Sequence, residues 1–171
     1  MTDPRYVPAD MLINEITNYL KENVKEIKPP EWAAFVKTST GKERLPIQND
    51  WWYRRSASIL RKLYLIGPAS VKTFRTIYGT RKRYGQRMEH HVKGSGSIIR
   101  EILQQLEKAG LVEKTKEGRI LTKQGRSIIN KLSTKIFNEL IKIRPELIKY
   151  KPGGGKVGGG PRTGRAKEKK T

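Results

Sequence analysis

Apolar residues recur at helical spacing in several segments of this chain, and proline or glycine separates most segments from the next. In WWYRRSASILRKLYLI the apolar side chains fall on one side of a helix. Asp50 precedes this segment, where a helix-capping side chain belongs, and Gly67-Pro68 ends it. Residues 8–24 also have apolar residues at helical spacing, and Met11 is among those expected to face inward. The periodicity predicts helices over residues 8–24, 51–66, 70–78, 97–109 and 123–143.

Between the last two predicted helices, LVEKTKEGRILT is typical of two short strands that turn at Glu117-Gly118. The strands are expected over residues 111–114 and 119–122, after a helix C-terminal glycine at Gly110. Three helices followed by a two-stranded hairpin is the element order of a winged helix. We therefore expect a mainly α protein: a winged-helix-like three-helix core with a short β-hairpin wing, and extra N- and C-terminal helices packed around it.

The composition of the chain changes abruptly after Tyr150, to KPGGGKVGGGPRTGRAKEKKT. This segment has no apolar face, so folding could not offset the backbone entropy that it would cost. We interpret residues 1–150 as a single winged-helix-like RNA-binding domain. Residues 151–171 are interpreted as a basic, glycine-rich tail that is disordered when the protein is free.

The chain carries 37 Lys and Arg residues against 16 Asp and Glu residues, a formal net charge of +21. Such a protein repels itself unless it meets a polyanion, and nucleic acid is the first partner to consider. No apolar run approaches the roughly 20 residues needed to span a membrane, and the N-terminus does not resemble a secretory signal. We expect a soluble intracellular protein. Without cysteine it can form neither a disulfide framework nor a zinc knuckle.

Sequence signatures of catalysis are not found. The chain has no G-x-x-x-x-G-K-[ST] phosphate loop, no H-E-x-x-H and no G-x-S-x-G, and only two histidines. We therefore expect no enzyme activity, no catalytic residue, no cofactor, no metal site, no small-molecule substrate and no membrane partner.

The helix predicted at 51–66 carries a basic face. Arg54 and Arg61 are seven residues apart, as are Arg55 and Lys62, so all four fall on neighbouring stripes of one side. No acid follows Asp50 in this helix to neutralise them. We interpret the face as a phosphate-binding surface; a solvated helix surface is the alternative reading.

Residues 78–96, YGTRKRYGQRMEHHVKGSG, show neither helical nor strand periodicity and are predicted to form an irregular, glycine-jointed loop. Its arginines could each grip a phosphate with two hydrogen bonds, and its tyrosine and histidine rings could stack on unpaired bases. This mixture suits folded RNA better than uniform DNA, although an incidentally charged flexible loop is also open. The cations of the tail indicate RNA contacts more weakly.

The helix predicted at 97–109 is a poor candidate for reading a DNA groove. Its outward residues include two acids, which would be costly between rows of phosphates. A DNA-binding winged-helix transcription regulator would need this helix and the wing to make the contacts, so that alternative is weaker. The residues expected to face outward are Arg100, Glu101, Gln104, Gln105, Glu107 and Lys108.

Several stretches occur together in an order that resembles one family. They are VPADMLI, PPEWAAFVKT, KERLP, DWWYRRSASILRKLY, GPASVKTFRTIYG, RKRYG, GSGSIIREILQQLEKAGLVEK and GRILTKQG. The chain is similar, over roughly residues 5–130, to small-subunit ribosomal protein nineteen of the archaeal and eukaryotic type, which is unrelated to the bacterial protein of that number. The resemblance, together with the absence of cysteine, suggests an archaeal source. The chain departs from the family pattern at Thr80, where a second glycine is usual, and at Met88, where a proline is common.

The resemblance implies a structural component of the small subunit of the cytoplasmic ribosome. Such a protein binds rRNA in the subunit head, meets neighbouring small-subunit proteins and contributes to subunit assembly and maturation. The family associates this role with Arg55, Arg61, the loop 81–91 and Arg100. A transient assembly factor remains an alternative. The full set of predicted RNA-binding residues is Arg54, Arg55, Arg61, Lys62, Arg81, Lys82, Arg83, Arg87, His90, Arg100, Lys156, Arg162 and Arg165.

Overall fold

A computed structural model describes residues 2–150, and the predictions made for the tail lie outside this range. The helices are α1 (Ala9–Asn23), α2 (Trp51–Ile66), α3 (Val71–Ile77), α4 (Gly96–Lys108) and α5 (Lys123–Ile143). Short 3-10 helices lie at Pro4–Tyr6, Glu31–Phe35 and Pro145–Tyr150. Two antiparallel hairpins pair β1 (Thr80–Lys82) with β2 (His90–Val92), and β3 (Val112–Lys114) with β4 (Arg119–Leu121). The mainly α class is therefore confirmed, while the winged-helix assignment stays a prediction.

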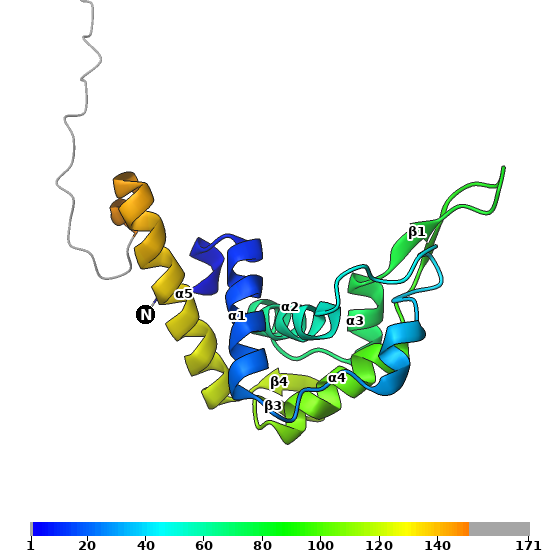
Figure 1. The fold of residues 1–171 in the computed structure, drawn as a ribbon, viewed down its shortest axis with the longest axis horizontal. Helices are drawn as coiled ribbons and strands as arrows, with labels where there is room; N and C mark the ends of the chain where they lie inside the picture. Colours follow the sequence, from blue (N-terminus) through cyan, green and yellow to red (C-terminus); the bar gives the residue numbers. More distant parts are fainter. Residues whose placement is uncertain (1, 151–171) are drawn as a thin grey trace, which may run out of the picture.

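The helices form a curved layer with α2 near its middle (Figure 1). α1 packs between α2 and α5 on one side, and α3 packs on α4 on the other. The largest fully buried side chains, Trp52, Phe74 and Phe137, come from α2, α3 and α5. One contiguous core therefore links the five helices. Met11, expected inside, is 36% exposed, because the buried stripe of α1 runs through Leu12, Ile16 and Leu20 instead.

Asp50 does not cap α2, contrary to the sequence prediction. Its backbone is not extended (φ −95°, ψ 13°), and its side chain makes no capping hydrogen bond. The carboxylate instead accepts a hydrogen bond from Lys21 Nζ at 3.0 Å, which ties the end of α1 to the start of α2. This partner also lowers the pKa of Asp50. Helix α2 nevertheless begins at Trp51, as predicted.

The β3–β4 hairpin lies where the sequence places the wing. Its tip includes Gly118, whose φ of +144° lies in the region that favours glycine. A side chain there would also lie 2.7 Å from the Ala69 carbonyl carbon. Ala69 and Arg119 exchange two backbone hydrogen bonds of 3.0 Å, so the chain before α3 adds a bridge to the outer edge of this hairpin. Gly110, with φ +70°, ends α4 as predicted.

The segment 78–96 is not the irregular loop that the sequence predicts, because β1 and β2 pair within it. Arg81 lies opposite His91, and Lys82 lies opposite His90. Only one residue in these strands, Val92, is apolar, so there is no hydrophobic alternation to reveal them. The backbone pairing and the anchoring of the hairpin base, described below, stabilise them instead.

Gln105 is buried, although the sequence placed it on the outer face of α4. Its Oε1 accepts a 2.9 Å hydrogen bond from Trp52 Nε1, and its Nε2 donates a 2.8 Å bond to the Lys28 carbonyl. The amide thus joins α4, α2 and the segment after α1. Glu107, another outward candidate, accepts a hydrogen bond from Arg119 Nε. These two residues are occupied within the fold and are not free to read a DNA groove.

We predict that Gln105→Leu lowers the free energy of unfolding by about 1–3 kcal/mol, because the buried Trp52 N–H loses its acceptor. Urea unfolding followed by tryptophan fluorescence measures the change. The matched control is Gln104→Leu at the exposed neighbouring position, where we expect a change within about 0.5 kcal/mol. Equal losses in the two variants would show that the Gln105 amide does not stabilise the core.

Candidate nucleic-acid interface

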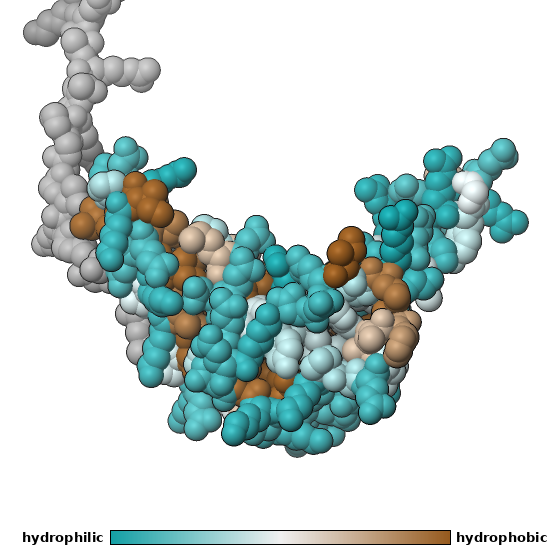
Figure 2. Space-filling view, in the orientation of Figure 1, coloured by the Kyte–Doolittle hydropathy of each residue, from teal (hydrophilic) through white to brown (hydrophobic). Residues whose placement is uncertain are grey.

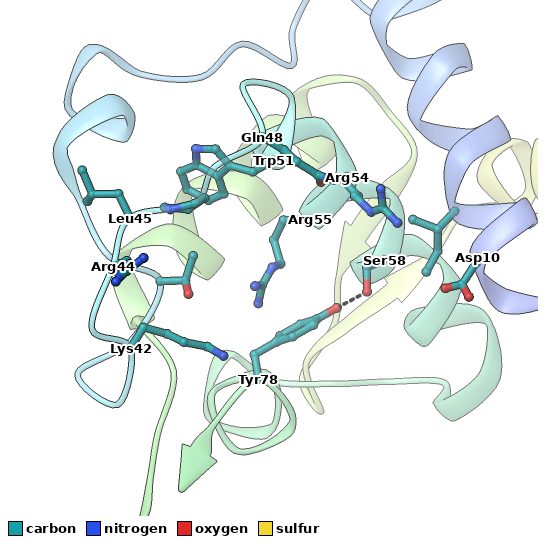
Figure 3. A pocket seen from close by; sticks show the side chains of 13 residues that line it. Asp10, Lys42, Arg44, Leu45, Gln48, Trp51, Arg54, Arg55, Ser58 and Tyr78 are labelled. Atoms are coloured by element: carbon teal, nitrogen blue, oxygen red, sulfur yellow. Dashed lines mark hydrogen bonds between the residues drawn. The ribbon is translucent and has the colours of Figure 1, made fainter. Parts of the chain in front are cut away.

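The exposed side of α2 forms one wall of a hollow, which we call the α2 pocket. The other walls come from the segment between the second 3-10 helix and α2, from Tyr78 at the end of α3 and from α1 (Figure 3). Arg55 points into this pocket from α2, and Lys42 reaches it from the opposite side. The cavity has a volume of ≈ 400 Å³. Its lining residues are Asp10, Ile13, Thr38, Lys42, Arg44, Leu45, Pro46, Gln48, Trp51, Arg54, Arg55, Ser58 and Tyr78.

Arg55 and Tyr78 form the floor of the α2 pocket. The Arg55 guanidinium carbon lies 4.2 Å from the centre of the Tyr78 ring, a cation–π contact. The Tyr78 hydroxyl lies 2.8 Å from Ser58 Oγ, which fixes the ring against α2. Burial lowers the pKa of Arg55 and raises the pKa of Tyr78. Arg55 is cationic at neutral pH, because an arginine guanidinium is effectively always protonated in proteins.

The basic face of α2 has no acidic partner within residues 2–150. The ion pairs found in this range join Lys21 to Asp50, Arg81 to Glu89, Arg119 to Glu107 and Lys135 to Glu15. None of them uses a cation of α2. The positive charge of this face is therefore available to an external anion, as the missing acids in the sequence indicate.

The four α2 cations predicted to bind phosphate do not all lie at one site. Arg54 and Arg55 line the α2 pocket, whereas Arg61 and Lys62, two turns further on, do not. Both are partly buried, and Arg61 Nε is buried without a hydrogen-bond partner. The sequence placed the four on one helix face, but the segment after α1 covers only the first two turns of that face.

The β1–β2 hairpin projects from the end of the molecule opposite α5 (Figure 1). Its surface is predominantly hydrophilic (Figure 2). Arg81 forms an exposed ion pair with Glu89 at 3.3 Å, and Lys82 Nζ lies 4.7 Å from the centre of the Tyr84 ring. The remaining candidates, Arg83, Arg87 and His90, are exposed.

The base of the hairpin is fixed against the chain that follows the second 3-10 helix. Gly94 donates a backbone hydrogen bond to the Arg75 carbonyl at 2.8 Å and accepts one from Arg75 Nε at 3.2 Å. Ser95 N donates to the Thr38 carbonyl at 3.0 Å, and Ser39 Oγ lies 3.3 Å from Thr80 Oγ1. The hairpin therefore extends from a rigid base.

Two glycines allow this close packing. A side chain at Gly79 would lie 2.4 Å from His91 Nε2 and 2.7 Å from the Val92 carbonyl oxygen. At Gly41 a Cβ atom would lie 2.3 Å from Thr80 Oγ1. Glycine is needed at these two positions because neighbouring atoms lie too close for a side chain, more than because the loop must be flexible.

A second hollow lies beside the hairpin base, and its lining includes Arg75, Lys82, Lys93 and Lys37. Sequence analysis missed Lys37, Lys42, Arg44 and Arg75 as site residues. The first three lie in residues 25–50, where the sequence predicted no helix and no site, and Arg75 lies on a short helix that was identified from its apolar residues. The signal for the first three was the excess of cations over acids in residues 37–49, where Lys37, Lys42 and Arg44 stand against Glu43.

The predicted site residues that remain are Arg100 and three residues of the tail. Arg100 is exposed on α4 and lines neither hollow. Lys156, Arg162 and Arg165 lie outside the described residues. Within residues 2–150, no cluster of three or more potential metal ligands occurs, and no helix is long and apolar enough to cross a membrane.

Comparison with known proteins supports the resemblance. The model of the family "Ribosomal protein S19e" matches residues 3–139. The chain belongs to the S19e family of ribosomal proteins. A relative from Aeropyrum pernix, named small ribosomal subunit protein eS19, is 50% identical over 152 residues, covering 88% of this chain and 99% of the relative. The proteins of the same name from Thermoplasma volcanium and Haloarcula marismortui are 43% and 44% identical, covering 88% and 84% of this chain and 99% and 95% of their own.

Membership of the S19e family confirms the recognition made from the sequence motifs, with archaeal proteins among the relatives. The family consists of structural ribosomal proteins, so the prediction that the chain is not an enzyme stands on that membership. The matched range contains α1 to α4, both hairpins and most of α5. Both basic hollows therefore belong to the part of the chain that defines the family.

We predict that Tyr78 titrates later than the other tyrosines, because burial raises its pKa above the ordinary value near 10. The stability that its neutral form contributes is complete below about pH 10 and is lost as pH rises through the raised pKa. Ultraviolet absorbance of phenolate, followed with pH, should show a late phase among the seven tyrosines. That phase should vanish in Tyr78→Phe and persist in Tyr84→Phe on the exposed hairpin; a late phase in both variants would contradict the assignment.

Proposed function

We propose that this protein is a structural component of the small ribosomal subunit that binds rRNA through the α2 pocket and the β1–β2 hairpin. The observation that carries the proposal is a pair of hollows, each lined by several cations, that share one segment of the chain. The segment 38–42 contributes Thr38 and Lys42 to the α2 pocket and Ser39 and Thr40 to the hollow beside the hairpin. The two hollows are therefore neighbours, and S19e membership supplies the ribosomal context.

The mechanism is electrostatic and geometric. Folded RNA brings phosphates close together, and cations placed between them displace counterions and reduce their repulsion. Arg54 and Arg55 are held on a helix whose other face is buried, and the hairpin extends from a rigid base. The protein thus acts as a spacer that fixes the distance between the RNA segments it contacts.

We further propose that α2, α3, α4 and the β3–β4 hairpin form a winged-helix-like unit. The element order, the packing of α3 on α4 and the bridge from Ala69 to the hairpin support this assignment. The β1–β2 hairpin would be an insertion between the second and third helices of the unit. Residues 1–150 would form a single domain, and the tail from residue 151, with Lys156, Arg162 and Arg165, would be an additional basic arm.

The partners proposed are small-subunit rRNA, in the head of the subunit, and neighbouring small-subunit proteins. The relatives are named as small ribosomal subunit proteins, so the ribosome in the cytoplasm is the location proposed for this chain. A contribution to subunit assembly is part of the proposal, because cations that neutralise closely spaced phosphates favour the folded RNA. No observation favours DNA regulation, since α4 uses Gln105 and Glu107 inside the fold.

We predict that replacing Arg81, Arg83 and Arg87 together by alanine leaves the fold intact and weakens incorporation into small subunits. If each arginine contacts one phosphate, the slope of log affinity for RNA against log salt falls by up to about 3. Incorporation is measured by the fraction of tagged protein that sediments with small subunits. A control variant with the exposed lysines Lys131, Lys142 and Lys149 changed to alanine loses the same charge from the α5 side. Equal incorporation of the two variants would contradict a specific role for the hairpin.

Gradient sedimentation of a native lysate tests the proposed function itself. A resident protein travels with mature small subunits and joined ribosomes and remains there after a high-salt wash. Sedimentation only with immature particles would identify a transient assembly factor instead. Release by a nuclease specific for DNA, with none of the protein in ribosomal fractions, would overturn the proposal.

A further inference from the structure

The α2 pocket is a concave part of the basic surface, and unlike the hollow beside the hairpin base it is lined by Trp51 and by Arg55 lying on Tyr78. Its volume of ≈ 400 Å³ lies within the range of roughly 300–1,000 Å³ that is usual for small-ligand sites. A regular RNA duplex is a rod that keeps its phosphates on the outside, so it can cover such a hollow but cannot fill it. A nucleotide that has left the stack can enter it.

The charges around the α2 pocket indicate an anionic occupant. Four cationic side chains line it, from Lys42, Arg44, Arg54 and Arg55, and a single acid, Asp10. Figure 3 shows the charged ends of Lys42 and Arg55 directed into the same hollow from opposite walls. Within residues 2–150 neither of them forms an ion pair. Two like charges that share a cavity repel each other, and a phosphate between them would relieve this repulsion.

The planar groups of the α2 pocket indicate that the occupant also carries a ring. One face of the Arg55 guanidinium lies on Tyr78, and the opposite face is directed away from that ring. Trp51, which is partly buried, lines the same cavity. Unpaired bases stack on arginine planes and on aromatic rings of this kind.

Polar groups on the lining could accept more than one base. The Gln48 side chain is exposed at the pocket and offers both an acceptor and two donors. The hydroxyl of Thr38, which also lines the pocket, can likewise either donate or accept a hydrogen bond. Such groups can bond the edge of a base without selecting strongly among the four.

We propose that the α2 pocket holds one unpaired nucleotide of a folded RNA, with its phosphate between Arg55 and Lys42 and its base stacked in the pocket on Arg55 or Trp51. The inference rests on the proposed function and specifies the RNA feature that the surface recognises. The hairpin and the outer part of α2 supply affinity for any phosphate backbone. The pocket supplies selection for a site where one nucleotide is extruded.

A binding comparison with two RNA probes tests the proposal. One probe is a short blunt RNA duplex, and the other is the same duplex with a single bulged nucleotide, prepared with each of the four bases. Fluorescence anisotropy at one salt concentration should show that the full-length protein binds the bulged duplex about tenfold more tightly, the gain expected from stacking one base.

Variants of the cations locate the effect. Arg55→Lys keeps the charge and removes the planar group, so it should abolish most of the preference for the bulged duplex. Lys42→Gln, at an exposed position that does not affect the core, should reduce the preference as well. Arg61→Lys is the matched control on the same helix, outside the pocket, and should retain the preference even if both affinities fall.

Equal affinity for the two probes, or an unchanged preference in both Arg55→Lys and Lys42→Gln, would overturn the inference and leave the proposed function standing. Binding of free AMP or UMP as tightly as the bulged duplex would assign the pocket to a free nucleotide and would overturn it too. Failure of the folded protein to bind either RNA would instead count against the proposed function.

Discussion

The burial of one face of α2 is the constraint on which the rest of the structure depends. Trp52 is fully buried and packs edge to face on Trp32 and Trp51, with ring centres 5.6 and 5.2 Å away. Its N–H group is satisfied by Gln105 of α4. Because this face is fixed from several directions, the opposite face of α2 has one orientation. The packing of α2 thereby positions the arginines on that face. They need no hydrogen bonds to acidic side chains, and such bonds would neutralise their charge.

The same constraint connects the two basic surfaces. Tyr78 ends α3, lies under Arg55 and immediately precedes the glycine that allows β2 to approach. Ser58 of α2 holds the Tyr78 ring, and the segment 38–42 contacts both the pocket and the base of the hairpin. A displacement of α2 would therefore move the pocket and the hairpin together. Rigidity of this kind suits a protein that keeps RNA segments at fixed distances.

Sequence analysis predicted the helices well because their signals are local. The boundaries of α2 and α5, the β3–β4 hairpin and the glycine at the end of α4 follow from periodicity and from turn residues. The predictions for Asp50, for Gln105 and for the β1–β2 hairpin were wrong for one physical reason. The conformation of each is determined by a partner far away in the sequence. Lys21 draws Asp50 away from the helix end, Trp52 draws Gln105 inward, and the segment near Ser39 anchors strands that have no hydrophobic pattern. For the site, charge could be read from the sequence but concavity could not, so Arg54 and Arg55 were found while Lys42 and Arg44 were missed.

The most direct test of the account is ultraviolet cross-linking of native small subunits that contain this protein, followed by mass spectrometry of the peptides that carry nucleotides. The account predicts cross-links in the segment before α2, at Trp51 or Tyr78, and along the β1–β2 hairpin, because these residues surround the basic hollows. Cross-links confined to the outer face of α4 and to the β3–β4 hairpin would contradict it, since the RNA would then meet the protein away from both basic hollows.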